Sequence, residues 1–313
     1  MIRLKRILSP LEKFQIIETV WLMLKYTKNR RQEKNLKSLH WLIQKSIQMF
    51  TNRLKIVRKE NSFAGEGKIL QETMNKLGIS GGYLVDIGAA DGIRQSSTSQ
   101  FLKHNTWQGA LLELNPESFS RLAFLYCSSD SVSLAKLKVT PKNVVKIFEG
   151  VEVPHTFEYL NIDVDSYDLS ILRVLLDAGY KPEIISMEVN EKFPPNIYFE
   201  VLYAEDHFWS GDHFFGCSLT AAHETLSIRG YTLHNLEYNN AIFVNSNSAL
   251  GNESEINLLT IYQNGYLFKS DRKVLFPWNE DFETIHSLDS NASIKFLNEK
   301  FSTYAGIYKM EAR

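Results

Sequence analysis

Apolar residues recur every three or four positions along the first 60 residues, a spacing that predicts two amphipathic helices. The first apolar stripe runs over 4–24 and the second over 36–57. Between them, the polar and charged residues of 28–34 could turn the chain into a helical hairpin. We therefore expect an N-terminal helical segment over residues 1–61.

From Ser62 the pattern changes to short apolar or β-branched runs that alternate with helical stretches, which predicts an α/β domain with a mainly parallel sheet. We expect this domain over 62–248. Residues 249–313 carry no recognisable motif and form a C-terminal extension of unknown role. The expected strands lie at 83–87, 110–113, 159–163 and 184–189, followed by a hairpin of 231–236 and 241–244. The expected helices cover 67–77, 97–104, 116–126, 169–178 and 219–229.

Charge is distributed unevenly along the chain, although the formal net charge is only −1. Residues 1–60 carry 15 Lys or Arg against 4 Asp or Glu, a net of +11, and the remaining 253 residues carry 20 against 32, a net of −12. Such a basic segment should meet an acidic surface. We expect it to pack on its own domain or on a second copy, with peripheral membrane contact as the alternative and nucleic acid not favoured.

Cysteine usage and hydropathy favour a cytoplasmic protein with possible membrane association. Cys127 and Cys217 are too few for a disulfide framework and show no metal-ligand spacing, so a reducing compartment is expected. No stretch reaches the roughly 18 uninterrupted apolar residues of a membrane-spanning helix. The basic start of the chain is not followed by a small-residue cleavage site, which argues against export.

The first chemical motif is the expected strand at 83–87, which runs into Asp86-Ile87-Gly88-Ala89-Ala90-Asp91-Gly92. Gly88 would let the backbone turn sharply and approach a ligand. Gly92 would keep the following helix near the strand, and the amide groups at that helix's N-terminus could face polar ligand atoms. The spacing differs from the G-x-G-x-x-G of dinucleotide-binding folds, and no pyrophosphate cradle follows.

The second motif is Trp107-Gln108-Gly109-Ala110-Leu111-Leu112-Glu113-Leu114-Asn115-Pro116, a strand that ends in an acid. Glu113 lies 27 positions after Asp86. In Rossmann-like folds an acid at the end of the second strand can accept both hydroxyls of an adenosine ribose. The order and spacing of the two motifs therefore predict a nucleoside-containing cofactor.

These residues resemble the class I S-adenosylmethionine-dependent methyltransferases, and more narrowly the FkbM-like and glycan-modifying relatives. Those proteins carry D-x-G-x-x-D-G, then S-x-T, then G-W-x-G-x-x-x-E-x-N-P, which here correspond to 86–92, Ser97-Thr98 and 105–116. The resemblance implies a Rossmann-like methyltransferase sheet with flanking helices over about 64–248. It also implies S-adenosylmethionine as cofactor, bound by Asp86, Gly88, Asp91, Gly92, Glu113 and Asp163.

Two further strands end in acids that should meet at one edge of the sheet, where ligands bind in open α/β folds. Asp163 and Asp165 follow the third expected strand, and Glu188 and Asn190 end the fourth. The resemblance implies that Asp163 lies near the methionine end of the cofactor, where it could take part in catalysis. Asp163, Asp165 and Glu188 could also bind a divalent metal such as Mg²⁺, although hydrogen bonding without a metal is favoured. Ser166 stands where FkbM-like enzymes usually have glycine.

A long aromatic loop over 192–218 has the length of a lid or binding loop. His207 and His213 within it are the candidate general bases, because histidine titrates near neutrality and both have acidic neighbours. The alternative is that either histidine is only a polar surface group. Phe215-Gly216-Cys217-Ser218-Leu219 also resembles a segment of the same relatives.

Together these motifs predict an S-adenosylmethionine-dependent O-methyltransferase that acts on a sugar hydroxyl of a surface glycan or glycolipid precursor. One alternative is a catalytically inactive cofactor-binding scaffold subunit that assembles through residues 1–60. The other is a nucleic-acid methyltransferase, anchored by the same basic residues. Against the latter, Asp163-Val164-Asp165-Ser166 stands where amino-methylating enzymes carry Asn/Asp-Pro-Pro-Tyr/Phe.

Overall fold

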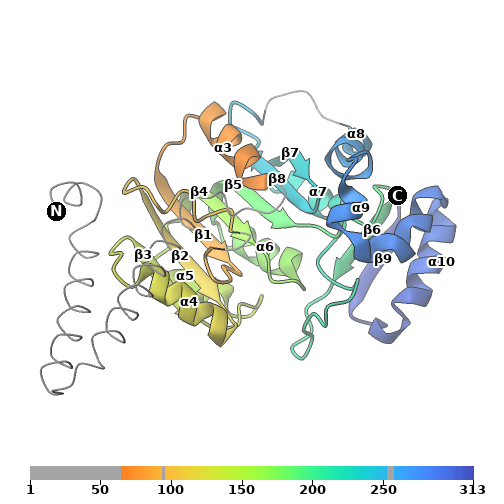
Figure 1. Ribbon diagram of the computed structural model, residues 1–313, viewed down its shortest axis with the longest axis horizontal. Helices are drawn as coiled ribbons and strands as arrows, with labels where there is room; N and C mark the ends of the chain where they lie inside the picture. The colour runs from red at the N-terminus through yellow and green to blue at the C-terminus, as the bar shows by residue number, and fades with distance from the viewer. Residues whose placement is uncertain (1–64, 94–95, 252–256) are drawn as a thin grey trace, which may run out of the picture. The chain divides into compact units, whose positions relative to one another are not determined.

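The computed structural model describes residues 65–93, 96–251 and 257–313 (Figure 1). The predicted N-terminal helical segment lies outside these residues. Among the helices of the described ranges, none is both long enough and apolar enough to cross a membrane.

A seven-stranded sheet forms the centre of the domain, in the order β3-β2-β1-β4-β5-β8-β7. The first five strands pair in parallel, whereas β8 pairs antiparallel with both β5 and β7. This arrangement confirms the predicted Rossmann-like sheet, and β7 and β8 are its predicted closing hairpin. The strands are β1 (Gly82–Ile87), β2 (Trp107–Glu113), β3 (Val132–Lys136), β4 (Thr156–Ile162), β5 (Lys181–Glu188), β7 (Tyr231–Glu237) and β8 (Asn240–Asn245).

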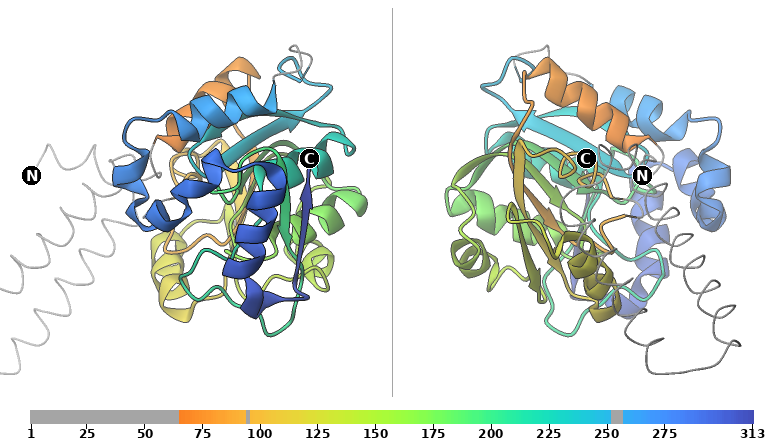
Figure 2. Two further views of the ribbon diagram at one scale, coloured as in Figure 1. Left: turned by 90° about the vertical axis from the view of Figure 1, so that its right-hand side faces the viewer. Right: turned by 60° about the vertical axis from the view of Figure 1, so that its left-hand side comes forward.

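Helices cover both faces of this sheet, which makes three layers (Figures 1 and 2). Alternate side chains of a strand point to opposite faces. Leu84 of β1 packs into the cluster that contains α3 and α4 residues, and Val85 packs into the cluster of α5, α6 and α7. Both side chains are completely buried, which explains why the strands read as continuous apolar runs. The helices are α3 (Glu66–Lys76), α4 (Pro116–Tyr126), α5 (Val144–Gly150), α6 (Asp168–Asp177) and α7 (Leu219–Ser227).

The helix predicted over 97–104 is wrong, because these residues form a series of turns. Their hydroxyl groups make hydrogen bonds that compete with a helix. Ser97 Oγ lies 3.0 Å from Tyr159 Oη, and Thr98 Oγ1 donates to Asp86 Oδ2 at 2.6 Å. The described residues between Gly92 and β2 therefore contain no helix, and the helix N-terminus that was expected directly after this turn is absent there.

A second, two-stranded antiparallel sheet joins β6 (Ile197–Val201) to the C-terminal strand β9 (Tyr308–Ala312). Phenylalanine rings from both parts of the chain form its core, as in the stack of Phe193 on Phe199 and the nearby Phe301. The segment from Leu258 onward thus packs around the loop that follows β5. Its elements are α8 (Leu258–Tyr262), the π-helix η2 (Gln263–Leu267), α9 (Arg272–Leu275), the 3-10 helix η3 (Pro277–Ser287), α10 (Ser290–Lys300) and the 3-10 helix η4 (Ser302–Tyr304).

Candidate active site

A cavity of about 950 Å³ opens at the carboxyl ends of β1, β2, β4 and β5. Its lining includes the turn after β1, the end of β2, the acids after β4 and β5, and aromatic residues of the β6–α7 loop and η3. Cavities of several hundred Å³ are typical of sites for cofactors and small ligands. This one therefore has room for a cofactor and part of a second molecule.

The turn after β1 brings the backbones of β1 and β4 into close approach. Gly88 has a φ of +91°, and a Cβ on it would lie 1.7 Å from the carbonyl oxygen of Asp163. The amides of Gly88 and Ala89 both donate to the carbonyl of Leu112, at 2.9 and 3.0 Å. Only glycine fits this position, which agrees with the role predicted for Gly88.

Asp86 lies beneath this turn, with 3% of its surface exposed. One carboxylate oxygen accepts from Thr98, and the other accepts from Asn161 Nδ2 at 2.9 Å. Burial raises the pKa of Asp86, whereas these hydrogen bonds oppose the rise. Asp86 lines the cavity, and it also joins the 96–106 loop to β4.

Glu113 is held between two backbone segments at the cavity wall. Its Oε2 accepts from the amide of Ala90 at 2.7 Å, and its Oε1 accepts from the amide of Asn115 at 2.5 Å. Asn115 is itself fixed as the N-cap of α4, where its side chain accepts from Glu117 N and Ser118 N. Each carboxylate oxygen retains a second lone pair. Glu113 can therefore accept two hydroxyl groups without moving.

Asp91 and Gly92 lie outside the cavity lining, unlike the other residues predicted to bind the cofactor. Asp91 accepts from the amide of Ile93 at 3.0 Å and lies 3.9 Å from Arg121. Gly92 has a φ of +67°, and a Cβ on it would lie 2.5 Å from Leu122 of α4. Both residues lie between the turn and α4, so they stabilise the shape of the turn by packing it against that helix.

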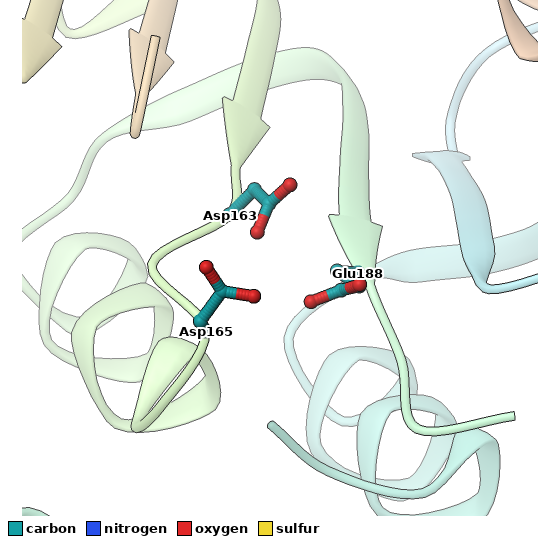
Figure 3. A group of neighbouring side chains, drawn as sticks. All are labelled: Asp163, Asp165 and Glu188. Carbon is teal, nitrogen blue, oxygen red and sulfur yellow. The ribbon is translucent and has the colours of Figure 1, made fainter. Parts of the chain in front are cut away.

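The three candidate metal ligands converge as predicted. Asp163 and Asp165 follow β4 and Glu188 ends β5, and their side chains point toward one space (Figure 3). One carboxylate oxygen from each residue lies within 4.8 Å of the others. Asp168 holds the intervening loop, because it accepts from the amides of Val164 and Ser166 at 2.7 and 3.0 Å. Such a cluster of oxygen ligands fits a hard divalent ion.

Burial and, after it, mutual repulsion raise the pKa values of the acids in this cluster. Burial, followed by the charges of Asp165 and Asp168, raises the pKa of Asp163 well above its usual value. Burial and Asp168 raise the pKa of Asp165 to about 6. Glu188 is shifted in the same direction, chiefly by burial and Asp163. Positive charge placed among these groups would relieve the repulsion.

Six carboxyl groups line the cavity, and Lys138 is the only Lys or Arg among its described lining residues. The Lys138 ammonium already donates to the carbonyl of Glu205 at 2.6 Å and lies 3.9 Å from the centre of the Phe208 ring. An acidic cavity favours ligands that carry positive charge. The six acids are Glu66, Asp86, Glu113, Asp163, Asp165 and Glu188.

The two candidate bases occupy different places. His207 lines the cavity, and its Nδ1 lies 2.7 Å from Ser166 Oγ. Burial lowers the pKa of His207, so its imidazole is neutral at pH 7. His213 is outside the cavity lining, where its Nε2 lies 3.2 Å from Asp281. Only His207 is therefore placed to meet a ligand.

Asn190, which follows Glu188 at the sheet edge, belongs to the protein interior. It is completely buried, and its amide donates to the carbonyls of His213 and Phe215, both at 3.0 Å. These two bonds tie the β6–α7 loop to the end of β5. Asn190 therefore stabilises the loop. Glu188 is the residue of β5 whose carboxyl group belongs to the acidic cluster.

Comparison with known proteins gives structural likenesses only. No protein-family model matches the chain, and no curated protein sequence matches it. Among solved structures, the CurJ carbon methyltransferase is 16% identical with a TM-score of 0.37, over 58% of this chain and 53% of the other. Fibrillarin from Aeropyrum pernix with bound S-adenosyl-L-methionine is 11% identical with a TM-score of 0.35, over 52% and 65%. The N-terminal domain of EvdMO1, in the presence of SAH and D-fucose, is 10% identical with a TM-score of 0.39, over 60% and 83%.

Two site residues lie where the sequence offered no signal. Glu66 begins α3, is 5% exposed and lines the cavity beside Asp86. Burial raises its pKa to about 8, against the opposing effect of a hydrogen bond from Ser97. Trp278 of η3 enters the lining from the C-terminal segment. Neither belongs to a motif, because long-range packing alone brings them to the sheet edge.

Proposed function

We propose that this protein is an S-adenosylmethionine-dependent O-methyltransferase. The observation that carries the proposal is the acid-lined cavity between the Gly88 turn and Glu113. S-adenosylmethionine bears a sulfonium and an ammonium group against a single carboxylate, and it has a ribose diol. Its charge and its diol therefore match the two distinctive properties of the cavity.

Each part of the cofactor has a counterpart in the cavity lining. Glu113 would accept the ribose hydroxyls, since both its oxygens are already oriented by backbone amides. Leu137 and Val139 offer apolar surface for the adenine ring. Asp163 follows β4, which lies on the opposite side of β1 from β2, and Glu66 is close enough to act on the pKa of Asp163. Both would face the methionine ammonium. Asp91 and Gly92 would not contact the cofactor, and would contribute to its binding by stabilising the turn after β1.

S-adenosylmethionine supplies, when bound, a methyl group for in-line displacement by a nucleophile. His207 would accept the proton that the acceptor hydroxyl loses as its oxygen bonds to carbon. The hydrogen bond between Ser166 Oγ and His207 Nδ1 holds the imidazole in place. For His207 to act as the base, Nδ1–H would donate to Ser166 Oγ, which leaves Nε2 free to accept the proton. Asp165 and Glu188 would accept hydrogen bonds from the acceptor, so the reaction needs no metal.

For the acceptor, we propose a sugar hydroxyl of a surface glycan or glycolipid precursor. The resemblance of the motifs to glycan-modifying relatives supports this choice. So does the part of the cavity lining where Asn239 and Asn240 lie beside Glu188. These side chains can hydrogen-bond several hydroxyl groups at once.

Binding and turnover experiments test this function directly. Calorimetry should show S-adenosylmethionine binding to the full chain, and its absence would end the proposal. A screen of sugar-nucleotide and lipid-linked glycan acceptors, with and without EDTA, should show methyl transfer that EDTA does not reduce. Binding without turnover on any acceptor would favour the inactive scaffold, and salt-dependent binding to DNA or RNA would favour the nucleic-acid enzyme.

For the basic residues 1–60, we propose contact with an acidic surface, of this domain or of a second copy. A net charge of +11 supports this assignment, and an anionic membrane is the alternative partner. Sedimentation at increasing ionic strength would detect self-association, and cosedimentation with phosphatidylglycerol vesicles would detect membrane contact.

Replacing His207 with Gln should lower turnover about 100-fold, the middle of the range for losing a general base. Cofactor affinity should stay within about threefold, because His207 lies at the acceptor side of the cavity. His213→Gln is the matched control, and it should retain turnover, since that histidine faces Asp281 outside the cavity. Equal losses in both variants would show that the loop, and not the base, had been damaged.

Cofactor affinity should rise with pH between about 6 and 7.5. Burial raises the pKa of Glu66 to about 8, so its carboxyl is mostly protonated at pH 6 and gains charge as pH rises. A cationic ligand binds the charged form, and one linked proton gives a slope of up to about tenfold per pH unit. Asp86, Asp163 and the Tyr159 hydroxyl are the ionisable groups that act on Glu66.

Glu66→Gln should flatten this pH dependence and weaken binding at pH 7.5. Glu72→Gln is the matched control, since Glu72 lies on the same helix with an exposed side chain paired to Lys68. Calorimetric titrations at three pH values measure both effects. An unchanged slope in Glu66→Gln would assign the pH dependence to another carboxyl group.

A further inference from the structure

Large exposed aromatic side chains stand at the mouth of the cavity. Trp209 is 43% exposed and Trp278 is 58% exposed, and both residues line the cavity that contains the acidic cluster. Phe208, beside Trp209, is 59% exposed. Exposed aromatic surface is unfavourable in water, and aromatic residues that surround a cavity commonly bind a ligand. The proposed cofactor contacts use none of these rings.

The ring of Trp209 is fixed in direction by its own loop. Its indole Nε1 donates to the carbonyl of Asp212 at 2.7 Å, and the ring packs edge-on against Phe215. The Asp212 carboxylate accepts from the amide of Phe214 at 2.9 Å and from the Tyr304 hydroxyl. Tyr304 belongs to the C-terminal segment, so that segment stabilises the loop conformation that presents Trp209.

The ring of Trp278 is held by aromatic residues of a different segment from the loop that carries Trp209. It packs edge-on against Phe276, with ring centres 5.5 Å apart. Phe276 is 4% exposed and stacks on Tyr238, in the turn between β7 and β8. A rigid support of this kind reduces the entropy lost when a ligand binds. The two tryptophans are therefore preorganised, although they come from different segments of the chain.

The mouth thus combines aromatic walls with a hydrogen-bonding floor. Asn239 donates to Glu188 at 2.7 Å, and the carboxyl groups of Glu188 and Asp165 both line the cavity. A pyranose ring has apolar C–H faces and a rim of hydroxyl groups, so it matches both features. A flat apolar acceptor would cover the carboxylates without pairing them, which is costly.

We propose that Trp209 and Trp278 form the subsite that holds the sugar ring of the acceptor. This inference rests on the proposed function, and it gives the C-terminal segment a direct part in substrate binding. The tryptophan rings contact the C–H faces of the sugar, and the carboxylates of Asp165 and Glu188 accept its hydroxyl groups. The hydroxyl to be methylated is then held beside His207.

The test uses the full chain, saturated with S-adenosylhomocysteine, and a panel of methyl glycosides of common hexoses. Saturation-transfer NMR identifies the glycoside that binds best, and tryptophan fluorescence gives its Kd. Trp278→Ala and Trp209→Ala should each raise this Kd about tenfold or more, and Trp278→Phe should restore much of the loss. Phe268→Ala is the matched control, because Phe268 is 67% exposed on the same segment but outside the cavity lining.

The outcomes separate this inference from the proposed function. Calorimetry with S-adenosylmethionine should give the same Kd for both alanine variants as for the wild type, within about twofold. Wild-type protein that binds no S-adenosylmethionine would refute the proposed function. Binding of the cofactor without binding of any glycoside would refute the subsite alone. Glycoside affinity that is unchanged in both alanine variants, or lowered equally in Phe268→Ala, would also overturn it.

Discussion

Replacing Gly88 with alanine is expected to abolish cofactor binding and to lower the melting temperature by about 10 °C. The new Cβ would lie 1.7 Å from the carbonyl oxygen of Asp163, and the φ of +91° disfavours any L side chain. Because the obstacle is backbone, no side-chain rotation can relieve the overlap, and β1 and β4 must separate. Destabilisation of about 3 kcal/mol or more is typical of such a change.

Gly150→Ala is the control for this prediction. A Cβ at Gly150 would meet nothing within 4 Å, so its melting temperature and cofactor affinity should stay near those of the wild type. Differential scanning calorimetry and isothermal titration measure the two effects separately. Wild-type melting and binding in Gly88→Ala would show that the close approach of β1 to β4 is not required.

Glu113→Gln is expected to raise the Kd for S-adenosylmethionine about 100-fold, which corresponds to about 2.7 kcal/mol. Both carboxylate oxygens accept a backbone amide, from Ala90 and from Asn115. A glutamine must turn its NH₂ toward one of these amides, so two donors face each other and one loses its partner. The negative charge beside the ribose hydroxyls is lost as well.

Glu117→Gln is the matched control, since Glu117 lies nearby on α4 with its side chain exposed and paired to Arg121. It should change the Kd by less than about twofold. Titration calorimetry at fixed pH and ionic strength measures both variants. A Kd within threefold of the wild type for Glu113→Gln would place the ribose elsewhere.

Local motifs predicted the part of the site that lies on consecutive residues. The apolar strand, the turn at Gly88 and the acid at Glu113 lie together because parallel strands place their carboxyl ends at one edge of the sheet. The same rule brought Asp163, Asp165 and Glu188 into one cluster. Sheet order was enough for these residues, because their positions follow from strand ends alone.

Predictions that depended on side-chain direction were less reliable. The helix expected over 97–104 was wrong, since Ser97 and Thr98 hydrogen-bond to β4 and β1 partners that are distant in sequence. His207 and His213 are six positions apart on one loop, yet only His207 reaches the cavity. The difference arises because Asp281 of η3 faces His213, which no local pattern reveals.

The amino-acid sequence by itself determined the α/β class, the order of the motifs and the sheet edge at which they meet. These features follow from hydrophobic periodicity and from glycines that permit a tight turn, and both are local properties of the chain. Only the tertiary structure placed Glu66 and Trp278 in the cavity lining and paired β9 with β6. Those contacts join segments far apart in sequence, so they depend on how buried surfaces fit together, which residue spacing does not encode.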